Sequence, residues 1–243
     1  MIPPIVSVIM PVYNAESYLS KSIESILCQT FGDFEFIIVN DGSNDSTWEV
    51  IQSYACKDNR IIAINQENIG LTKSLNRCIS MSRGEFIARQ DADDKSRRDR
   101  LEVQLSWMKY DKYDMCCSRT WLVSERKKSP GWSYWIPKGI LMLKQNPFIH
   151  GTFFMRKDKL IKVGCYNQKY YYAQDYDLMV RWKLAGLNIK YLREDLYQTI
   201  QMEGSISNVY NQKQEFFKRD IRKKWRKNFI SYLLSYNFNN YFE

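Results

Sequence analysis

The first hundred residues alternate between short apolar runs and segments in which apolar residues recur at helical spacing. The runs have the length of buried strands and are bounded by proline, glycine or asparagine. They cover residues 6–10, 34–39, 61–64 and 85–88. In the segments between them, apolar side chains repeat every three or four residues, as in Leu19, Ile23, Ile26 and Leu27. This alternation predicts an α/β fold with a doubly wound, mostly parallel sheet.

Two of the predicted helices begin with polar residues. Glu16 is expected in the first turn of the helix after the first strand, where the helix dipole favours an anion. Ser46 is expected to cap the next helix. Both assignments assume that each helix starts close to the end of the preceding loop.

Polar residues also follow the strands directly. Asn14 comes after the first strand, Asp41 after the second, and residues 91–94 (Asp-Ala-Asp-Asp, the acidic loop) after the fourth. Ligands of open α/β sheets bind outside the carboxyl ends of the strands, so these groups are expected to converge on one edge. The turn at residues 11–16 lacks the G-x-G-x-x-G sequence of dinucleotide-binding domains, and the chain contains no P-loop sequence. A divalent cation held by the acidic loop is therefore expected to neutralise bound phosphates.

Charge is concentrated near the end of the chain. The 243 residues carry a net charge of +9, and residues 213–228 hold eight Lys or Arg against two acidic residues. This excess favours an anionic partner, which could be acidic lipid, nucleic acid or an acidic protein. No signal peptide is expected, and no run approaches the roughly 20 apolar residues of a membrane-spanning helix. We therefore expect a cytoplasmic protein that contacts a membrane, if at all, from the inner face.

The same terminal segment carries an apolar stripe at steps of four. Its members are Phe217, Ile221, Trp225, Phe229 and Leu233. A basic amphipathic helix of this kind is typical of proteins that lie on an anionic membrane surface, and we expect peripheral membrane contact here. The alternative is a helix that docks its stripe on the core and leaves its charges in solvent.

Three stretches, in this order, resemble the family 2 glycosyltransferases with the GT-A fold. They are SVIMPVYN at residues 7–14, VNDGSNDS at 39–46 and RQDADD at 89–94. The resemblance covers roughly residues 5–200 and extends to the short bacterial enzymes that build O-antigen or capsule repeats on a lipid carrier. It implies an inverting transfer from a nucleotide-diphosphate sugar to a polyprenyl-diphosphate-linked saccharide. The expected donor is a UDP-sugar. The resemblance also implies a divalent metal ion, Mn²⁺ or Mg²⁺, and no nucleic-acid partner.

The resemblance divides the chain into a GT-A domain at 1–210 and a basic amphipathic helical tail at 211–243. Within the domain, residues 1–100 form the nucleotide-sugar half, and 101–210 form the acceptor half with the catalytic base.

Nucleotide-binding roles are implied for residues of the first two motifs. Pro11, Tyr13 and Glu16 would line the nucleotide pocket, and Asp41 would accept a hydrogen bond from the base. Lys73, after a turn at 68–70, stands where the family often has a basic residue near the phosphates.

In the acidic loop, the implied metal ligand is Asp93. Asp91 would contact the ribose or sugar side of the donor, Asp94 would reach toward the donor sugar, and Ala92 between them would also belong to the donor-binding residues. An acidic run alone is most often a solvated loop. Its place after a buried strand, together with the resemblance, favours metal binding.

The implied catalytic base is Asp175. Relatives often have Glu-Asp before an aromatic residue, whereas this chain has Gln174 before Asp175. Inverting transfer needs a base opposite the leaving diphosphate to take the proton of the acceptor hydroxyl. Asp175 precedes apolar residues at helical spacing, so a simple helix cap is the alternative. Gln174 removes a like charge that would disfavour the ionised base.

Two further features remain open at this point. His150, the sole histidine, is either structural or close to the donor diphosphate. The aromatic residues 132–135 form either a sugar-stacking surface or ordinary packing. Arg181-Trp182 resembles part of the Q-x-x-R-W motif of processive synthases but follows Asp175 too closely, so we interpret the pair as helix packing.

Two other classes of function compete with a glycosyltransferase. A nucleotidyltransferase of similar architecture would normally have a Gly-rich basic loop after the first strand, which is lacking here. A non-catalytic sugar-nucleotide-binding module of the same fold would not depend on Asp175.

Overall fold

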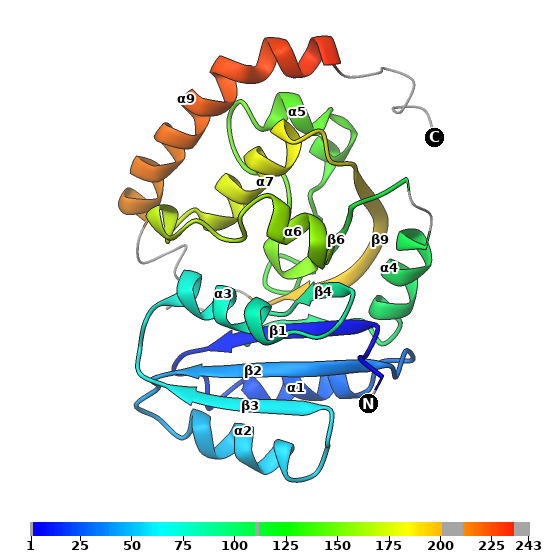
Figure 1. Cartoon of the computed structure of the whole chain (residues 1–243), viewed down its shortest axis with the longest axis vertical. Helices are drawn as coiled ribbons and strands as arrows, with labels where there is room; N and C mark the ends of the chain where they lie inside the picture. Colours follow the sequence, from blue (N-terminus) through cyan, green and yellow to red (C-terminus); the bar gives the residue numbers. More distant parts are fainter. Residues whose placement is uncertain (1, 110–111, 201–210, 236–243) are drawn as a thin grey trace.

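The computed structural model describes residues 2–109, 112–200 and 211–235 and shows one sheet with helices on both sides (Figure 1). The first half consists of β1 (Val6–Val12), α1 (Leu19–Leu27), β2 (Phe34–Asp41), α2 (Thr47–Ala55), β3 (Ile61–Gln66), α3 (Leu71–Met81) and β4 (Phe86–Arg89). All four predicted strands and the helices between them are present, and the strand starts agree to within one residue. The mixed α/β fold expected from the sequence is confirmed.

The second half is less regular. It consists of β5 (Lys95–Ser96), α4 (Arg100–Met108), β6 (Met115–Leu122), β7 (Lys127–Ser129), η1 (Trp132–Trp135), α5 (Lys138–Leu141), η2 (His150–Thr152), β8 (Phe154–Arg156), α6 (Lys157–Lys162), η3 (Gln168–Tyr170), α7 (Gln174–Leu184), β9 (Ile189–Thr199) and α9 (Asn211–Ser235). The boundary expected at residue 210 lies outside the described residues, and the division into halves stays a prediction.

A single sheet runs through both halves in the order β3-β2-β1-β4-β8-β6-β9-β5, with β7 paired to β6. The strands β3, β2, β1 and β4 are parallel, as the βαβ pattern predicts. β8 is antiparallel to both of its neighbours, β4 and β6, and so joins the halves.

Alternate residues of the central strands enter two separate cores. In β1, Val8 and Met10 face α1 and α2, whereas Ile9 belongs to a core that includes Leu75 of α3 and residues of α7. Figure 1 shows α1 and α2 on one side of the parallel strands and α3 on the other. The strands are apolar on both faces because both faces are covered.

One expectation about a helix start is wrong, and another, that Ser46 caps α2, holds for its position but not for its hydrogen bonding. Helix α1 begins at Leu19 and has no acidic residue in its first turn, so Glu16 lies before it. The Glu16 carboxylate instead accepts a hydrogen bond from the backbone N–H of Ser46, just before α2. Ser46 makes no capping bond through its side chain, and Asp45 accepts the N–H of Thr47 in its place. A long-range contact from Glu16 and a local one from Asp45 thus replace the expected caps.

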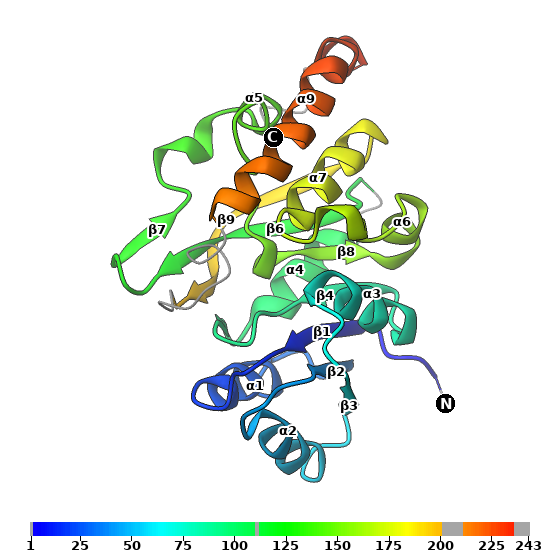
Figure 2. The same ribbon diagram turned by 90° about the vertical axis from the view of Figure 1, so that its left-hand side faces the viewer.

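The terminal helix α9 packs its apolar stripe on the core, against α7 (Figure 2). Ile221 and Trp225 are fully buried, and Phe217 and Phe229 are partly buried against the same core; the side chain of Leu233 lies outside those described. The expectation that this stripe faces a membrane is therefore corrected. No helix in the described parts of the chain is long and apolar enough to cross a membrane.

Candidate active site

The carboxyl ends of β1, β2 and β3 point to one side of the molecule, the left-hand side of Figure 1 that faces the viewer in Figure 2. The loops after these strands carry the first two polar motifs. The acidic loop follows β4, the neighbour of β1, and so lies at the same edge. The expected convergence of polar groups at this edge is present.

The loop after β1 and the loop after β2 are held together by reciprocal hydrogen bonds. Asn14, in the left-handed region at φ 48°, donates its N–H to Oγ of Ser43 (2.9 Å) and accepts from the N–H of Asn44 (2.9 Å). Glu16 donates its N–H to Asp45 (3.2 Å). In this frame Pro11 is buried, whereas the Tyr13 side chain is 47% exposed. An exposed ring beside a rigid loop is available to a flat ligand.

Asp41 is buried at the end of β2 and holds the turn that leads into α3. Its carboxylate accepts hydrogen bonds from the N–H groups of Ile69 (2.9 Å) and Gly70 (3.0 Å) and from the Gln66 amide (2.7 Å). A carboxylate has roughly four acceptor sites, so these three donors leave room for about one more. Lys73, in the first turn of α3, is exposed.

A buried polar network supports the acidic loop from below. The fully buried Arg100 donates to Ser96 (2.9 Å), to Gln90 (3.2 Å) and to the carbonyl oxygen of Arg89 (2.8 Å). The Tyr197 hydroxyl accepts the N–H of Asp91 (2.9 Å). These contacts fix the path of the loop from the protein interior, because each of the three guanidinium nitrogens of Arg100 donates where water is excluded.

The carboxylates of the acidic loop repel one another. Burial and the charge of Asp91 raise the pKa of Asp93 to about 6. Burial and the charges of Asp91 and Asp93 raise the pKa of Asp94 to about 9. Asp91 itself is paired with the buried guanidinium of Arg89 (2.5 Å). The loop therefore has more negative charge than its protein neighbours neutralise.

This donor set fits a hard divalent cation. Mg²⁺ and similar ions take carboxylate oxygens and typically keep ligand positions for phosphates and water. In the ranges that the structure describes, no three His, Cys, Asp or Glu side chains form a ready-made metal cluster. The partly exposed Asp93 could thus supply one ligand, with the others coming from a bound diphosphate and water.

His150 lies between the acidic loop and the start of α7. Its Nε2 is hydrogen-bonded to the Tyr166 hydroxyl (2.7 Å). Burial and the charge of Arg89 lower the pKa of His150 to about 4, while the charges of Asp175 and Asp91 act in the opposite direction. The imidazole is therefore neutral at pH 7, and both carboxylates lie within electrostatic reach of it.

The neighbouring Gly151 allows η2 to pack closely against the acidic loop. A Cβ at this position would lie 2.5 Å from the Tyr197 hydroxyl oxygen and 2.7 Å from Oδ2 of Asp91. Any side chain would push the acidic loop away. Glycine at 151 thus lets η2 approach Asp91 and places His150 beside it.

Asp175 is in the first turn of α7, where the helix dipole favours its charge. Its Oδ2 accepts a hydrogen bond from Nδ2 of Asn146 (2.7 Å). The preceding Gln174 is buried, and its Oε1 has no hydrogen-bond partner. The carboxylate is partly exposed and thus accessible to a ligand.

The sequence analysis missed several residues that shape this site. They are Arg89, Arg100, Asn146 and Tyr197. Arg89 lies inside a recognised motif, but nothing local shows that it is buried. Arg181, interpreted as helix packing, binds Asp177 (2.7 Å) and the carbonyl oxygen of Cys165 (2.7 Å), which agrees with a structural role.

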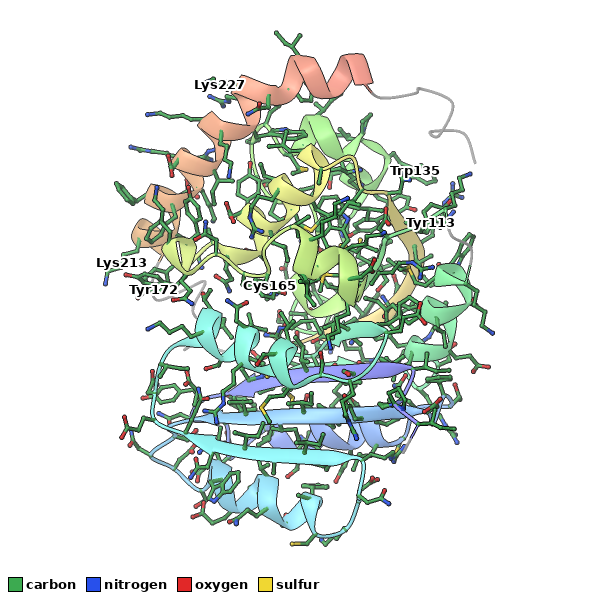
Figure 3. The ribbon with its side chains drawn as sticks, viewed as in Figure 1. Tyr113, Trp135, Cys165, Tyr172, Lys213 and Lys227 are labelled. Carbon is green, nitrogen blue, oxygen red and sulfur yellow. The ribbon has the colours of Figure 1, made fainter. Side chains whose placement is uncertain are left out.

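The aromatic stretch at 132–135 is partly packed and partly exposed. Tyr134 donates to the carbonyl oxygen of Tyr191 (3.1 Å), whereas Trp135 is 69% exposed with the Arg193 guanidinium 4.7 Å from its ring centre (Figure 3). The side chain of Trp132 lies outside those described. Packing therefore holds for Tyr134, and a sugar-stacking role for the exposed Trp135 stays a prediction.

Known proteins share both the sequence and the architecture. EpsE of Bacillus subtilis, described as a putative glycosyltransferase, is 36% identical over 201 residues, which cover 80% of this chain and 72% of EpsE. Staphylococcus aureus TarS, solved in complex with UDP-GlcNAc, superposes with a TM-score of 0.74 over 97% of this chain and 74% of that one, at 20% identity. The mannosyltransferase PcManGT of Pyrobaculum calidifontis, with GDP-Man and Mn²⁺, gives a TM-score of 0.68 over 82% of this chain and 57% of that one, at 18% identity.

The two structural neighbours show the fold, and the sequence supplies the family. The family described as glycosyl transferase family 2 matches residues 7–167, which contain the loops after β1 and β2, the acidic loop and His150. With EpsE similar over most of its length, the assignment no longer depends on short motifs. The chain is a glycosyltransferase and belongs to glycosyl transferase family 2.

Proposed function

We propose that this enzyme transfers a sugar, with inversion, from a UDP-sugar to a hydroxyl group of a polyprenyl-diphosphate-linked saccharide, in O-antigen, capsule or exopolysaccharide synthesis. One observation carries the proposal: Gly151 packs against Asp91 of the acidic loop, and the charges of Asp91 and Asp175 both reach the adjacent His150, so the candidate metal-binding loop and the candidate base lie near the same side chain. The complex of TarS with UDP-GlcNAc supports a uridine donor for this fold.

In this proposal the donor lies along the carboxyl ends of the parallel strands. Pro11, Tyr13 and Glu16 line the nucleotide pocket, and the remaining acceptor position of Asp41 takes the base N–H. Lys73 lies near the phosphates.

The acidic loop and His150 border the sugar and its diphosphate. Asp91 contacts the ribose or sugar side, Asp94 reaches toward the sugar, and Ala92 between them also belongs to the donor-binding residues. A Mn²⁺ or Mg²⁺ ion bound through Asp93 would stabilise negative charge on the diphosphate. The complex of PcManGT with Mn²⁺ supports this choice of ion.

Asp175 acts as general base. A hydroxyl oxygen attacks the anomeric carbon while its proton passes to the free carboxylate oxygen of Asp175, and the diphosphate leaves from the opposite face. His150 lies between the acidic loop and Asp175. Because it is neutral, it adds no charge to either.

The test begins with a thermal-shift panel of nucleotide sugars with Mn²⁺ to identify the donor, followed by donor hydrolysis. Asp93→Ala should lose the Mn²⁺-dependent rate. Asp175→Asn should keep the donor-induced shift but hydrolyse the donor about 10²- to 10⁴-fold more slowly. Asp158→Asn, an exposed residue in the first turn of α6, is the matched control and should behave as wild type. Full activity in both site variants would defeat the proposal.

We further propose that α9 holds the enzyme at the inner face of the cytoplasmic membrane, through the face opposite its buried stripe. Phe216 is 72% exposed and Ile230 is 71% exposed, and exposed basic residues lie between them: Arg219, Lys223, Arg226 and Lys227. Figure 3 shows Lys213 and Lys227 along the outer side of the helix. Apolar side chains flanked by cations suit the surface of an acidic bilayer.

Flotation with vesicles of phosphatidylcholine, with and without phosphatidylglycerol, tests the surface. Lys223→Glu with Lys227→Glu should reduce flotation on the acidic vesicles, whereas Lys21→Glu with Lys162→Glu, exposed elsewhere, should not. Equal flotation of the two double variants would exclude α9 as the contact.

A further inference from the structure

Asn146 holds one oxygen of the Asp175 carboxylate in a defined orientation. It lies in the loop between α5 and η2 and donates Nδ2–H to Oδ2 of Asp175 (2.7 Å). Its own Oδ1 accepts the backbone N–H of Phe148 (3.1 Å). Because this backbone donor requires the amide oxygen, the amide nitrogen must face Asp175.

The segment that carries Asn146 is fixed from behind by α9. The indole N–H of Trp225 donates to the carbonyl oxygen of Gly139 (3.0 Å), and Arg222 donates to that of Lys144 (3.0 Å). The Tyr176 hydroxyl, one residue after the base, donates to the carbonyl oxygen of Met142. Helices α7 and α9 thus clamp the same segment, which leaves the Asn146 amide little freedom to turn away.

We propose that Asn146 is a positioning residue for the general base, an inference that rests on the role proposed for Asp175. A donor bound to one carboxylate oxygen favours the ionised form and prevents rotation of the group. Only the other oxygen is then free to take the acceptor proton. A neutral amide achieves this without cancelling the negative charge that the base needs.

The charges of the groups around Asp175 explain why an amide is suited to position 146. Groups within electrostatic reach of Asp175 include His150, Tyr166 and Tyr176, all neutral at pH 7. Glu215 and the cations Arg222 and Arg226 act on Tyr176 from α9. A carboxylate in place of Asn146 would add a second negative charge within hydrogen-bonding distance of the base.

The experiment measures the pH–rate profile of metal-dependent donor hydrolysis, with the donor found by the thermal-shift panel. Asn146→Leu, of similar size without a donor, should lower kcat roughly 10- to 100-fold with little change in the donor KM. Its acidic limb should move to higher pH, because the ionised base loses its hydrogen bond. Asn146→Asp should move the acidic limb further to higher pH, because it adds a negative charge beside Asp175. It should regain part of the rate at high pH only if Asp175 keeps its orientation.

Asn167→Leu is the matched control, since Asn167 binds only a local backbone N–H, that of Lys169. It should keep the wild-type acidic limb whatever its stability. Should the leucine variant fail to fold, the isosteric aspartate variant still decides the question. A wild-type acidic limb in the Asn146 variants would overturn the proposal while leaving Asp175 as base. An Asp175→Asn enzyme with full activity would instead remove the role of Asp175 itself.

Discussion

The two carboxylate regions of the site are supported in opposite ways. The acidic loop follows a central strand and lies on a fully buried polar network formed by Gln90, Arg100 and neighbouring groups. Asp175 is held by one side-chain hydrogen bond, from a loop 29 residues away. Its surroundings are fixed by α9, more than 30 residues further along the chain. The proposed donor side is therefore built into the core of the fold, whereas the proposed acceptor side depends on the docking of peripheral elements.

The largest effect is expected from removing Trp225, the buried side chain that holds α9 on the core. Trp225→Ala should cost about 3–5 kcal/mol in free energy of unfolding, because a fully buried indole is lost. It should also slow donor hydrolysis at temperatures where the variant is folded, since the segment leading to Asn146 loses its hydrogen bond. Phe216→Ala, on the exposed side of the same helix, should stay within about 0.5 kcal/mol. A folded Trp225→Ala enzyme with normal hydrolysis would show that α9 does not support the base.

The second variant addresses the donor side. Arg100→Met should lower the free energy of unfolding by about 3 kcal/mol, because it strands buried acceptors on Gln90, Ser96 and Gln104. Arg98→Met, exposed two residues earlier, is the control and should have little effect in the same urea titration. Equal stability of both variants would mean that the acidic loop does not need its buried network.

The smallest expected effect concerns His150, which lies between the two regions. Its pKa of about 4 in the folded protein is below the value of about 6.5 expected for an unfolded chain. Between these pH values the unfolded chain binds more protons, so this contribution to stability is present at pH 7 and is lost as the pH falls toward 4. The stability difference between wild type and His150→Gln should therefore change by about 2 kcal/mol between pH 7 and pH 4.5, measured in EDTA. A difference that is constant with pH would show that His150 is freely protonated in the folded protein.

Local patterns were enough to predict the strands and loops that make up the proposed donor side. The apolar runs of β1 and β2 gave strands that start at Val6 and Phe34, and the polar residues that follow them reach a common edge as expected. The glycosyltransferase family and its fold were also predicted correctly from three short motifs. Information of this kind is local, since it is contained in a strand and the turn that follows it.

The acceptor side depends on contacts that no local pattern encodes. The stripe of α9 correctly indicated an amphipathic helix, but the same stripe suits a membrane or a protein core, and the core is what it covers. Glu16 was assigned to the wrong helix because its partner, the Ser46 N–H, lies 30 residues away. Asn146 has no sequence signal at all, since its contact with Asp175 forms only when the loop after α5 meets the start of α7.

The position of β8 limits the movements by which substrates can enter and products can leave. This strand bonds to β4 on one side and to β6 on the other, so hydrogen bonds of one continuous sheet cross from the first half to the second. A hinge motion that separates the two halves would break these hydrogen bonds. It would also break the bond from the Arg89 N–H to the carbonyl oxygen of Phe153 (2.9 Å). Turnover is therefore expected to proceed with a stationary sheet, and the movement that admits a donor or releases a nucleotide to be confined to the loops at its edge.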